Sequence, residues 1–189
     1  MNHYQSHYIK NLLLPCLAFS ICTGVFSAVF ITLFKIAVSF IVGISESVYA
    51  TARANPVWLP LLIGGAALLG LASALILSIS PDCRGGGIPT SVAAIRGIVS
   101  FKWLASIFIL PYSALLTLLC GIPLGTEGPC VQMGTAIGDG VIQVIGGEKH
   151  KGWRRYMMTG GAASGFALAT GSPITATFSA SKATMGARI

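Results

Sequence analysis

Charged side chains are the scarcest class in this chain. Asp, Glu, Lys and Arg make up 9% of its 189 residues, whereas a soluble domain carries roughly a quarter. Hydrophobic residues account for 54%, and the mean hydropathy is +0.80. These proportions exclude an ordinary soluble domain. They predict an all-α integral membrane protein that passes several times through the inner or plasma membrane of a cell and is surrounded by the lipid bilayer.

A targeting signal and a domain boundary are also missing. The apolar run at residues 12–44 is longer than a signal-peptide core and ends without a convincing cleavage site, so we expect it to form the first membrane helix. No shift in composition marks a second domain, so residues 1–189 are interpreted as a single transmembrane domain. The net charge is +7, but its basic residues lie in short connections, which indicates topology rather than a nucleic-acid partner.

Cysteines and histidines, which many metal and catalytic sites need, are few in this chain and do not cluster in the sequence. The cysteines are odd in number and scattered: Cys16, Cys22, Cys83, Cys120 and Cys130. Four of them lie in or beside apolar runs and are interpreted as packing residues, and no metal or cofactor is predicted. An intramembrane hydrolase built on Ser164 would need a base at depth, but His3, His7 and His150 all lie outside the apolar runs. The chain is therefore not predicted to be an enzyme.

The apolar runs predict a multi-helix bundle of long and short, broken helices. Helices are expected at residues 12–44, 57–79, 100–120, 129–145, 156–170 and 174–189, with a shorter one at 85–97. Residues 45–55 are expected to form a polar connection, and Lys35 to lie near a helix end from which its amine reaches the headgroups. The basic stretch at 146–155 is expected to face the cytoplasm.

One acid stands inside an apolar stretch. Glu127 lies between Gly125 and Gly128, with Pro129 directly after them. An ionisable side chain at membrane depth costs roughly 2.5–3.5 kcal/mol, so it usually marks an ion path or a partnered site. The other interpretation is an interfacial loop in which the carboxylate only contacts water. Asp139, further along the same predicted helix, needs water or a partner, and the sequence assigns it no role.

A glycine run opens the other short helix. Gly85, Gly86 and Gly87 precede Ile88 and Pro89, and a proline in the first turn is typical of a helix start. Such a start leaves backbone N–H groups without intrahelical partners. As a phosphate-binding loop the run is a weak match, because no lysine follows the glycines and no strand precedes them.

The glycine-proline stretches at 85–89 and 125–129 suggest that two helix N-termini meet inside the membrane. Irregular backbone survives at membrane depth only where protein or a water-filled cavity covers it. Helix N-termini that meet near the midplane bind anions, because each presents about half a positive charge and free N–H donors. A carboxylate at such a terminus can occupy the place of the anion and swing away. We therefore predict that Glu127 acts as a gate.

Three motifs resemble those of the CLC family of chloride channels and proton-coupled chloride transporters. The stretch GTEGPCVQMG at 125–134 is similar to the family's GxEGP…VQ.G signature, and GGGIP at 85–89 is similar to its GSGIP. Residues 160–173 are similar to the small-residue segment that ends in Asn-Ala-Pro. The motifs occur in the family's order, and the resemblance covers most of the chain from about residue 12.

The resemblance implies both a fold and a function. It implies the first half of an inverted-repeat bundle, with short re-entrant helices, in a homodimer that carries chloride or a similar anion through one pore per subunit. The carrier would be a voltage-gated channel or a transporter. Glu127 would be the gating residue, and the anion would bind at Gly86, Gly87, Ile88, Glu127, Gly128 and Pro129.

The chain departs from the family pattern at several positions. Gly86 stands where the family has an anion-coordinating serine, which leaves the preferred anion open, and Thr126 replaces the usual basic residue. Lys182 and Ala183 stand where a pair of glutamates commonly closes the family's helix, and one of those serves the internal proton route in exchangers. Proton coupling through that route is therefore not expected.

The family's second half, with its GxFxP helix end and anion-binding tyrosine, does not occur in this sequence. We expect either that the chain is a fragment or truncated product, or that another chain completes the pore. The alternative function is a small structural or assembly protein of the membrane without transport activity, which faces rich in glycine and alanine would suit equally well.

Overall fold

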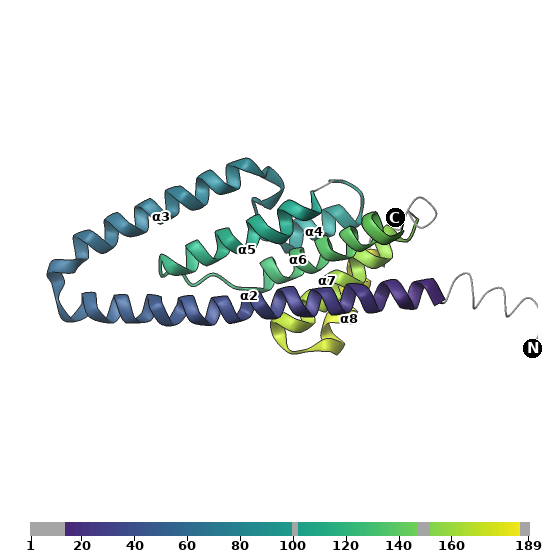
Figure 1. The fold of residues 1–189 in the computed structure, drawn as a ribbon, viewed down its shortest axis with the longest axis horizontal. Coiled ribbons are helices and arrows are strands. Elements are labelled where there is room, and N and C mark those ends of the chain that lie inside the picture. Colours follow the sequence, from purple (N-terminus) through teal and green to yellow (C-terminus); the bar gives the residue numbers. More distant parts are fainter. Residues whose placement is uncertain (1–13, 100–101, 147–151, 186–189) are drawn as a thin grey trace, which may run out of the picture.

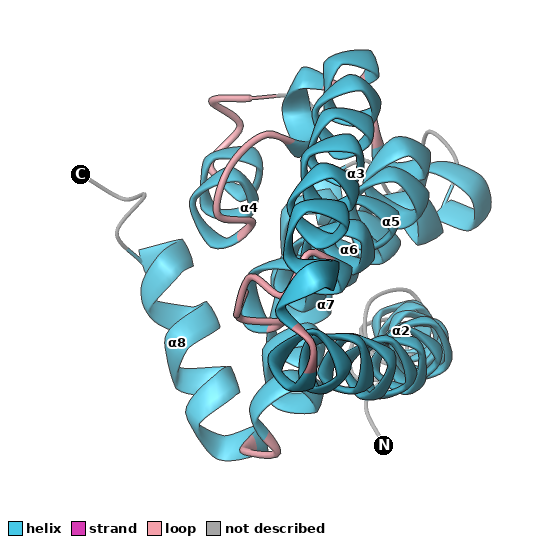
Figure 2. Cartoon of the chain, turned by 90° about the vertical axis from the view of Figure 1, so that its left-hand side faces the viewer, coloured by secondary structure: helices cyan, strands magenta, loops and turns pink. Residues whose placement is uncertain are grey.

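A computed structural model describes residues 14–99, 102–146 and 152–185 of the protein. In these ranges the chain is helical and contains no strand (Figures 1 and 2). The α-helices are α2 (Leu14–Ala54), α3 (Leu59–Ile79), α4 (Ile88–Ile95), α5 (Trp103–Leu119), α6 (Glu127–Val141), α7 (Arg154–Thr170) and α8 (Pro173–Met185). Short 3-10 turns at Pro56–Trp58 and Pro81–Cys83 flank α3, and a π-helical turn at Ile142–Gly146 ends α6.

Two helices, α2 and α3, are long and apolar enough to cross a membrane. In Figure 1, α2 is a rod along the whole molecule, and α3 returns beside it and diverges from it. Both expose large hydrophobic side chains, among them Leu33, Phe40, Leu68 and Leu75. Apolar side chains on the outside of a helix agree with a lipid environment.

The first helix is longer than predicted. Residues 45–54 continue α2 instead of forming a connection, and the helix ends just before Pro56. Its hydroxyls bond back to the helix itself, with Ser47 Oγ donating to Ile44 O at 2.7 Å and Thr51 Oγ1 to Ser47 O at 2.9 Å. Polar residues of this kind do not break a helix, whereas a proline disfavours helical backbone at the residue before it.

The extension of α2 changes the position of Lys35. This lysine lies near the middle of the 41-residue helix and not near an end, so the prediction from the shorter helix was wrong. Its Nζ donates a hydrogen bond to Leu168 O at 2.9 Å, in the last turn of α7. The amine therefore binds the negative end of a neighbouring helix.

The core is formed by α6 against α7. Every residue of α6 from 129 to 141 is buried. The two helices touch through glycines: a Cβ on Gly134 would lie 2.1 Å from Gly161 O, and one on Gly138 would lie 2.2 Å from Met157 O. Small residues spaced four apart allow such an approach between membrane helices. Figure 2 shows α8 on the side of α7 that faces away from α5.

Candidate anion site

The starts of α4 and α6 meet backbone to backbone. A Cβ on Gly87 would lie 2.3 Å from Gly128 O, and a Cβ on Gly128 would lie 2.3 Å from Gly86 O. Helix α4 begins at Ile88 and α6 begins at Glu127, so the contact joins the N-terminal ends of the two broken helices. We call this contact of Gly86 and Gly87 with Gly128 the glycine crossover.

The local sequence explains why α4 and α6 begin where they do. Gly85 has φ +132° and Gly87 has φ +74°, backbone conformations that favour glycine. The carbonyl of Gly87 accepts from Ser91 Oγ at 2.7 Å and from the Ser91 amide at 3.0 Å. Neither α4 nor α6, both lying in the described part of the chain, has a side-chain cap at its N-terminus. Their first amide groups are therefore not occupied by a capping side chain.

A cavity of about 340 Å³ adjoins the glycine crossover. Its walls come from the end of α3, the glycine run before α4, the middle of α5 and the start of α6. Of the predicted site residues, the cavity is lined by Gly86, Gly87, Gly128 and Pro129. The structure therefore brings four of the six together around one space, whereas Ile88 and Glu127 are not part of the wall.

Glu127 is the first residue of α6, and its side chain is exposed. It stands in the chain between two residues of the cavity wall, Gly125 and Gly128. A carboxylate at a helix N-terminus is stabilised by the positive end of the helix dipole. The same N-terminus would attract a dissolved anion, so the carboxylate and an anion would compete for one position.

Two hydroxyl residues of the cavity wall were missed by the sequence reasoning. Ser113 and Thr117 lie on α5, one turn apart, and both line the cavity. Ser113 Oγ lies 2.9 Å from Ser73 Oγ of α3, and Thr117 Oγ1 donates to Ser113 O at 2.9 Å. Their spacing of four residues, which places both on one helix face, is the signal that could have found them.

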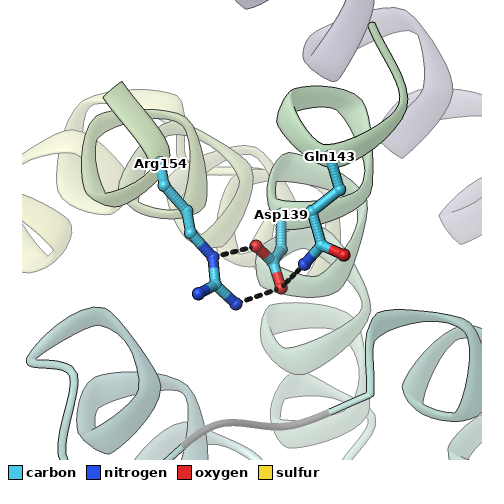
Figure 3. A network of polar contacts seen from close by, with 3 residues as sticks. All are labelled: Asp139, Gln143 and Arg154. Carbon is cyan, nitrogen blue, oxygen red and sulfur yellow. Dashed lines mark hydrogen bonds and ion pairs between the residues drawn. The ribbon is translucent and has the colours of Figure 1, made fainter. Parts of the chain in front are cut away.

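The far end of α6 carries a charged network (Figure 3). Asp139, for which the sequence offered no role, is fully buried and forms an ion pair with Arg154, the first residue of α7. Arg154 Nη2 donates to Asp139 Oδ2 at 2.8 Å, and its Nε donates to Oδ1. Gln143 Nε2 donates to the same Oδ2 at 2.9 Å. The buried carboxylate is thus bound by three donors.

Cations also lie at the C-terminal ends of other helices. Arg84 Nε donates to Leu77 O at 3.2 Å, in the last turn of α3, and Arg155 Nη2 donates to Arg96 O at 3.2 Å, just after α4. Lys35 does the same at the end of α7. The negative ends of α3, α4 and α7 are therefore compensated by side chains, while the positive ends at the glycine crossover lie beside the cavity without a capping side chain.

Both segments that form the glycine crossover lie in a part of the chain that matches a known protein family. A family model described as voltage gated chloride channel matches residues 68–186, which is more than half of the chain. The chain belongs to the voltage-gated chloride channel family. The matched residues run from the middle of α3 through α8, so this all-α membrane family includes both sides of the glycine crossover.

Curated relatives in this family are named as transporters. The H(+)/Cl(-) exchange transporter ClcA of Vibrio vulnificus (strain YJ016) is 30% identical over 179 residues, which cover 92% of this chain and 37% of the relative. The protein of the same name from Vibrio campbellii is 33% identical over 121 residues, which cover 64% of this chain and 26% of the relative. The matched part of this member of the chloride channel family thus spans 37% of the length of the first relative and 26% of the second.

Proposed function

We propose that this chain forms part of a pore for chloride or a similar anion, and that the anion binds in the cavity beside the glycine crossover. The contact of Gly87 with Gly128 carries the proposal, because it directs the N-terminal ends of α4 and α6 to one place. Each helix end contributes about half a positive charge and N–H groups of its first turn, although the Ile88 amide donates to Gly86 O and neither Pro89 nor Pro129 has an N–H. Two such ends attract an anion through backbone charge, and no cationic side chain stands among the described residues that line the cavity.

Glu127 is the gate of this pore. It is the first residue of α6, beside two residues of the cavity wall. A carboxylate that turns toward the wall occupies the anion's place at the helix N-terminus, and one that turns outward leaves it free. Its exposed position gives the side chain room to change rotamer.

The cavity compensates in part for the departures from the family pattern. Gly86 offers no hydroxyl, but Ser113 and Thr117 line the same space. Thr117 Oγ1 already donates to Ser113 O, so Ser113 Oγ is the hydroxyl that can donate to an anion, with Ser73 Oγ as the donor of their mutual bond. Thr126 adds no positive charge, so the anion is attracted mainly by the helix N-termini. An anion held by backbone amides and neutral hydroxyls is selected by size and hydration more than by a fixed charge.

The pore is completed by residues beyond this chain. One wall of the cavity would come from the remainder of a longer polypeptide, as the greater length of the relatives suggests, or from another chain. We also propose a homodimer, which is what the family resemblance implies. Lys182 lies in the last turn of α8, where the resemblance places an acid. We therefore expect chloride movement that is not coupled to protons through that route.

Chloride efflux from reconstituted vesicles tests the gate. We expect Glu127→Ala to change the efflux rate strongly, with faster efflux because the carboxylate no longer competes with the anion. Glu46→Ala is the matched control, since Glu46 is an exposed acid on α2, away from the cavity wall. Efflux that is the same in wild type and Glu127→Ala would refute the gate.

A purely structural or assembly role is the second candidate, and one observation favours it. A Cβ on Gly64, Gly65 or Gly70 of α3 would meet no atom within 4 Å, so this helix has an open small-residue face on which another helix can pack. Efflux no faster than from empty vesicles, for wild type and for Glu127→Ala alike, would favour this role over the pore when the vesicles also contain the residues that complete the pore.

A further inference from the structure

The two helices that meet at the glycine crossover are also bound at their other ends, by neighbouring residues. Arg154 binds Asp139, near the end of α6, and Arg155 binds the carbonyl of Arg96, just after the end of α4. We call Arg154 and Arg155 the arginine clamp. Each broken helix therefore has its start in the crossover and its end at one of these two arginines.

The Arg154 arm of the clamp is the stronger one. Asp139 has no exposed surface, and Arg154 approaches it with two N–H groups in parallel. Such two-armed contacts between guanidinium and carboxylate fix orientation as well as distance. A buried carboxylate that loses its cation is strongly unfavourable, so α6 cannot turn or slide without a large cost while the pair exists.

The Arg155 arm is weaker and depends on the turn after α4. Arg155 is exposed and makes one hydrogen bond, of 3.2 Å, to Arg96 O. Gly97 has φ +75°, and a Cβ there would lie 3.0 Å from Arg155 Nη2. The turn at Gly97 therefore leaves just enough room for the guanidinium beside the end of α4.

We propose that the arginine clamp consists of positioning residues, which set how the starts of α4 and α6 lie against each other at the cavity. The effect of the clamp on anion binding rests on the proposed function. The contacts of Arg154 and Arg155 themselves do not depend on whether the protein transports an anion. The glycine crossover has no side chains that interlock, so its registry depends on contacts elsewhere on the helices. Arg154 lies at the start of α7, which is packed closely along α6, and so the pair joins these two helices at one end.

Two native cysteines lie near the starts of α4 and α6, so the accessibility of their thiols can be used to detect movement there. Cys130 lies in the first turn of α6 with no exposed surface, and Cys83 lies just before the glycine run with 2% exposed. Cys130 is nine residues from Asp139, a separation of about 13 Å at 1.5 Å per residue. Cys16 and Cys22, which are half-buried on α2, serve as internal references.

The experiment measures the alkylation rate of each cysteine by N-ethylmaleimide, by mass spectrometry of the purified full chain. We expect Arg154→Ala to raise the rate at Cys130 by about tenfold or more, because the unpaired Asp139 favours local opening of α6. Arg155→Ala is expected to raise the rate at Cys83 by only a few fold, as an exposed contact is weaker. Arg53→Ala, which removes the same charge from the end of α2, is the control and is expected to leave both rates unchanged.

A conservative variant separates positioning from general loosening. Arg154→Lys keeps the charge but cannot form two parallel bonds, so we expect a smaller, selective rise at Cys130. Unchanged rates at Cys130 and Cys83 in the alanine variants would overturn the proposal. So would an equal rise at all five cysteines in Arg154→Ala without a selective rise in Arg154→Lys.

A functional measurement follows from the same variants. In vesicles that conduct, Arg154→Lys is expected to shift the ratio of chloride to nitrate efflux by a few fold, because the spacing of the two helix starts changes. An unchanged ratio together with selective labelling of Cys130 would overturn the link to selectivity. Alkylation requires no transport, so a failure of the pore proposal would appear only in the efflux measurements and a failure of the clamp only in the labelling.

Discussion

Helices α4 and α6 are built differently at their two ends. At the starts, Gly87 and Gly128 bring backbone against backbone, and neither start, as far as the structure describes the chain, carries a capping side chain. At the other ends, charged side chains make the contacts: Arg155 on the carbonyl of Arg96, and Arg154 on the buried carboxylate of Asp139. Both helices thus begin at a contact between backbone atoms. At their other ends, α6 has an ion pair and α4 has a hydrogen bond from a charged side chain.

The difference follows from the direction of the helix dipole. A side chain that capped the positive start would compete with an anion for the free amides. The negative C-terminal end of a helix does not bind the anion, and a nearby cation stabilises it. In α3, α4 and α7 a cation therefore binds a carbonyl at or near the C-terminal end, whereas no side chain caps the starts of α4 and α6 at the cavity.

Filling the glycine crossover is expected to have the largest effect. Gly87→Ala would place a Cβ 2.3 Å from Gly128 O in a residue with φ +74°, and overpacking together with the strained backbone costs roughly 3 kcal/mol or more. Thermal unfolding in detergent measures the loss. Gly125→Ala is the control, since a Cβ there meets nothing within 4 Å. Equal unfolding temperatures for the two variants would contradict a close contact.

Removing the cation at the C-terminal end of α6 is expected to give the next largest loss of stability. Arg154→Ala is expected to cost about 2–3 kcal/mol, because Asp139 stays buried without its cation and Arg154 itself is only half-buried. In the Asp139→Asn background the same change should cost about 1 kcal/mol or less. A double-mutant cycle of chemical unfolding gives the difference. Additive losses would mean that the pair contributes no coupling energy.

The hydroxyls of the cavity wall should matter less for stability than for selectivity. Ser113→Ala removes the partner of Ser73 and is expected to cost about 1 kcal/mol, with a change in the ratio of chloride to nitrate efflux. Ser78→Ala serves as the control, because its hydroxyl bonds only within its own helix. If Ser78→Ala shifted the efflux ratio as much as Ser113→Ala, the wall hydroxyls would have no special part in selection.

The smallest effect is expected at Lys35. Lys35→Met removes the hydrogen bond to Leu168 O but keeps most of the side-chain volume, so about 0.5–1 kcal/mol should be lost. Lys35→Arg should retain most of the stability, since a cation still reaches the end of α7. Unfolding in detergent compares the two variants. A loss larger than that of Arg154→Ala would show that the lysine contact outweighs the buried ion pair, contrary to this expectation.

The sequence predicted much of the site because the site is made of backbone. Glycine runs followed by Pro89 and Pro129 indicate helix starts through local chemistry alone, and both starts lie where the motifs place them. The role of Glu127 as a gate stays a prediction. Ser113 and Thr117 could not be assigned to the cavity, because their common wall with Gly86 depends on how α5 packs against α4 and α6.

Two features of the fold were not predicted from the sequence, one because it depends on a tertiary contact and one because a local pattern was misinterpreted. Asp139 is 15 residues from Arg154, and they meet because α7 packs closely along α6. The predicted basic stretch at 146–155 lies partly outside the described residues, but its Arg154 and Arg155 provide the clamp. The length of α2 was underestimated because polar residues at 45–54 were interpreted as a connection, although their hydroxyls are satisfied within the helix.

Locating a bromide ion tests the anion site most directly. Crystals soaked in bromide would show an anomalous density peak for the ion, and we expect the peak in the cavity between Gly86, Gly87 and Gly128, with a second peak near residue 127 in the Glu127→Gln variant. Bromide found only at the surface arginines in both proteins, with none beside the starts of α4 and α6, would contradict an anion site at the glycine crossover.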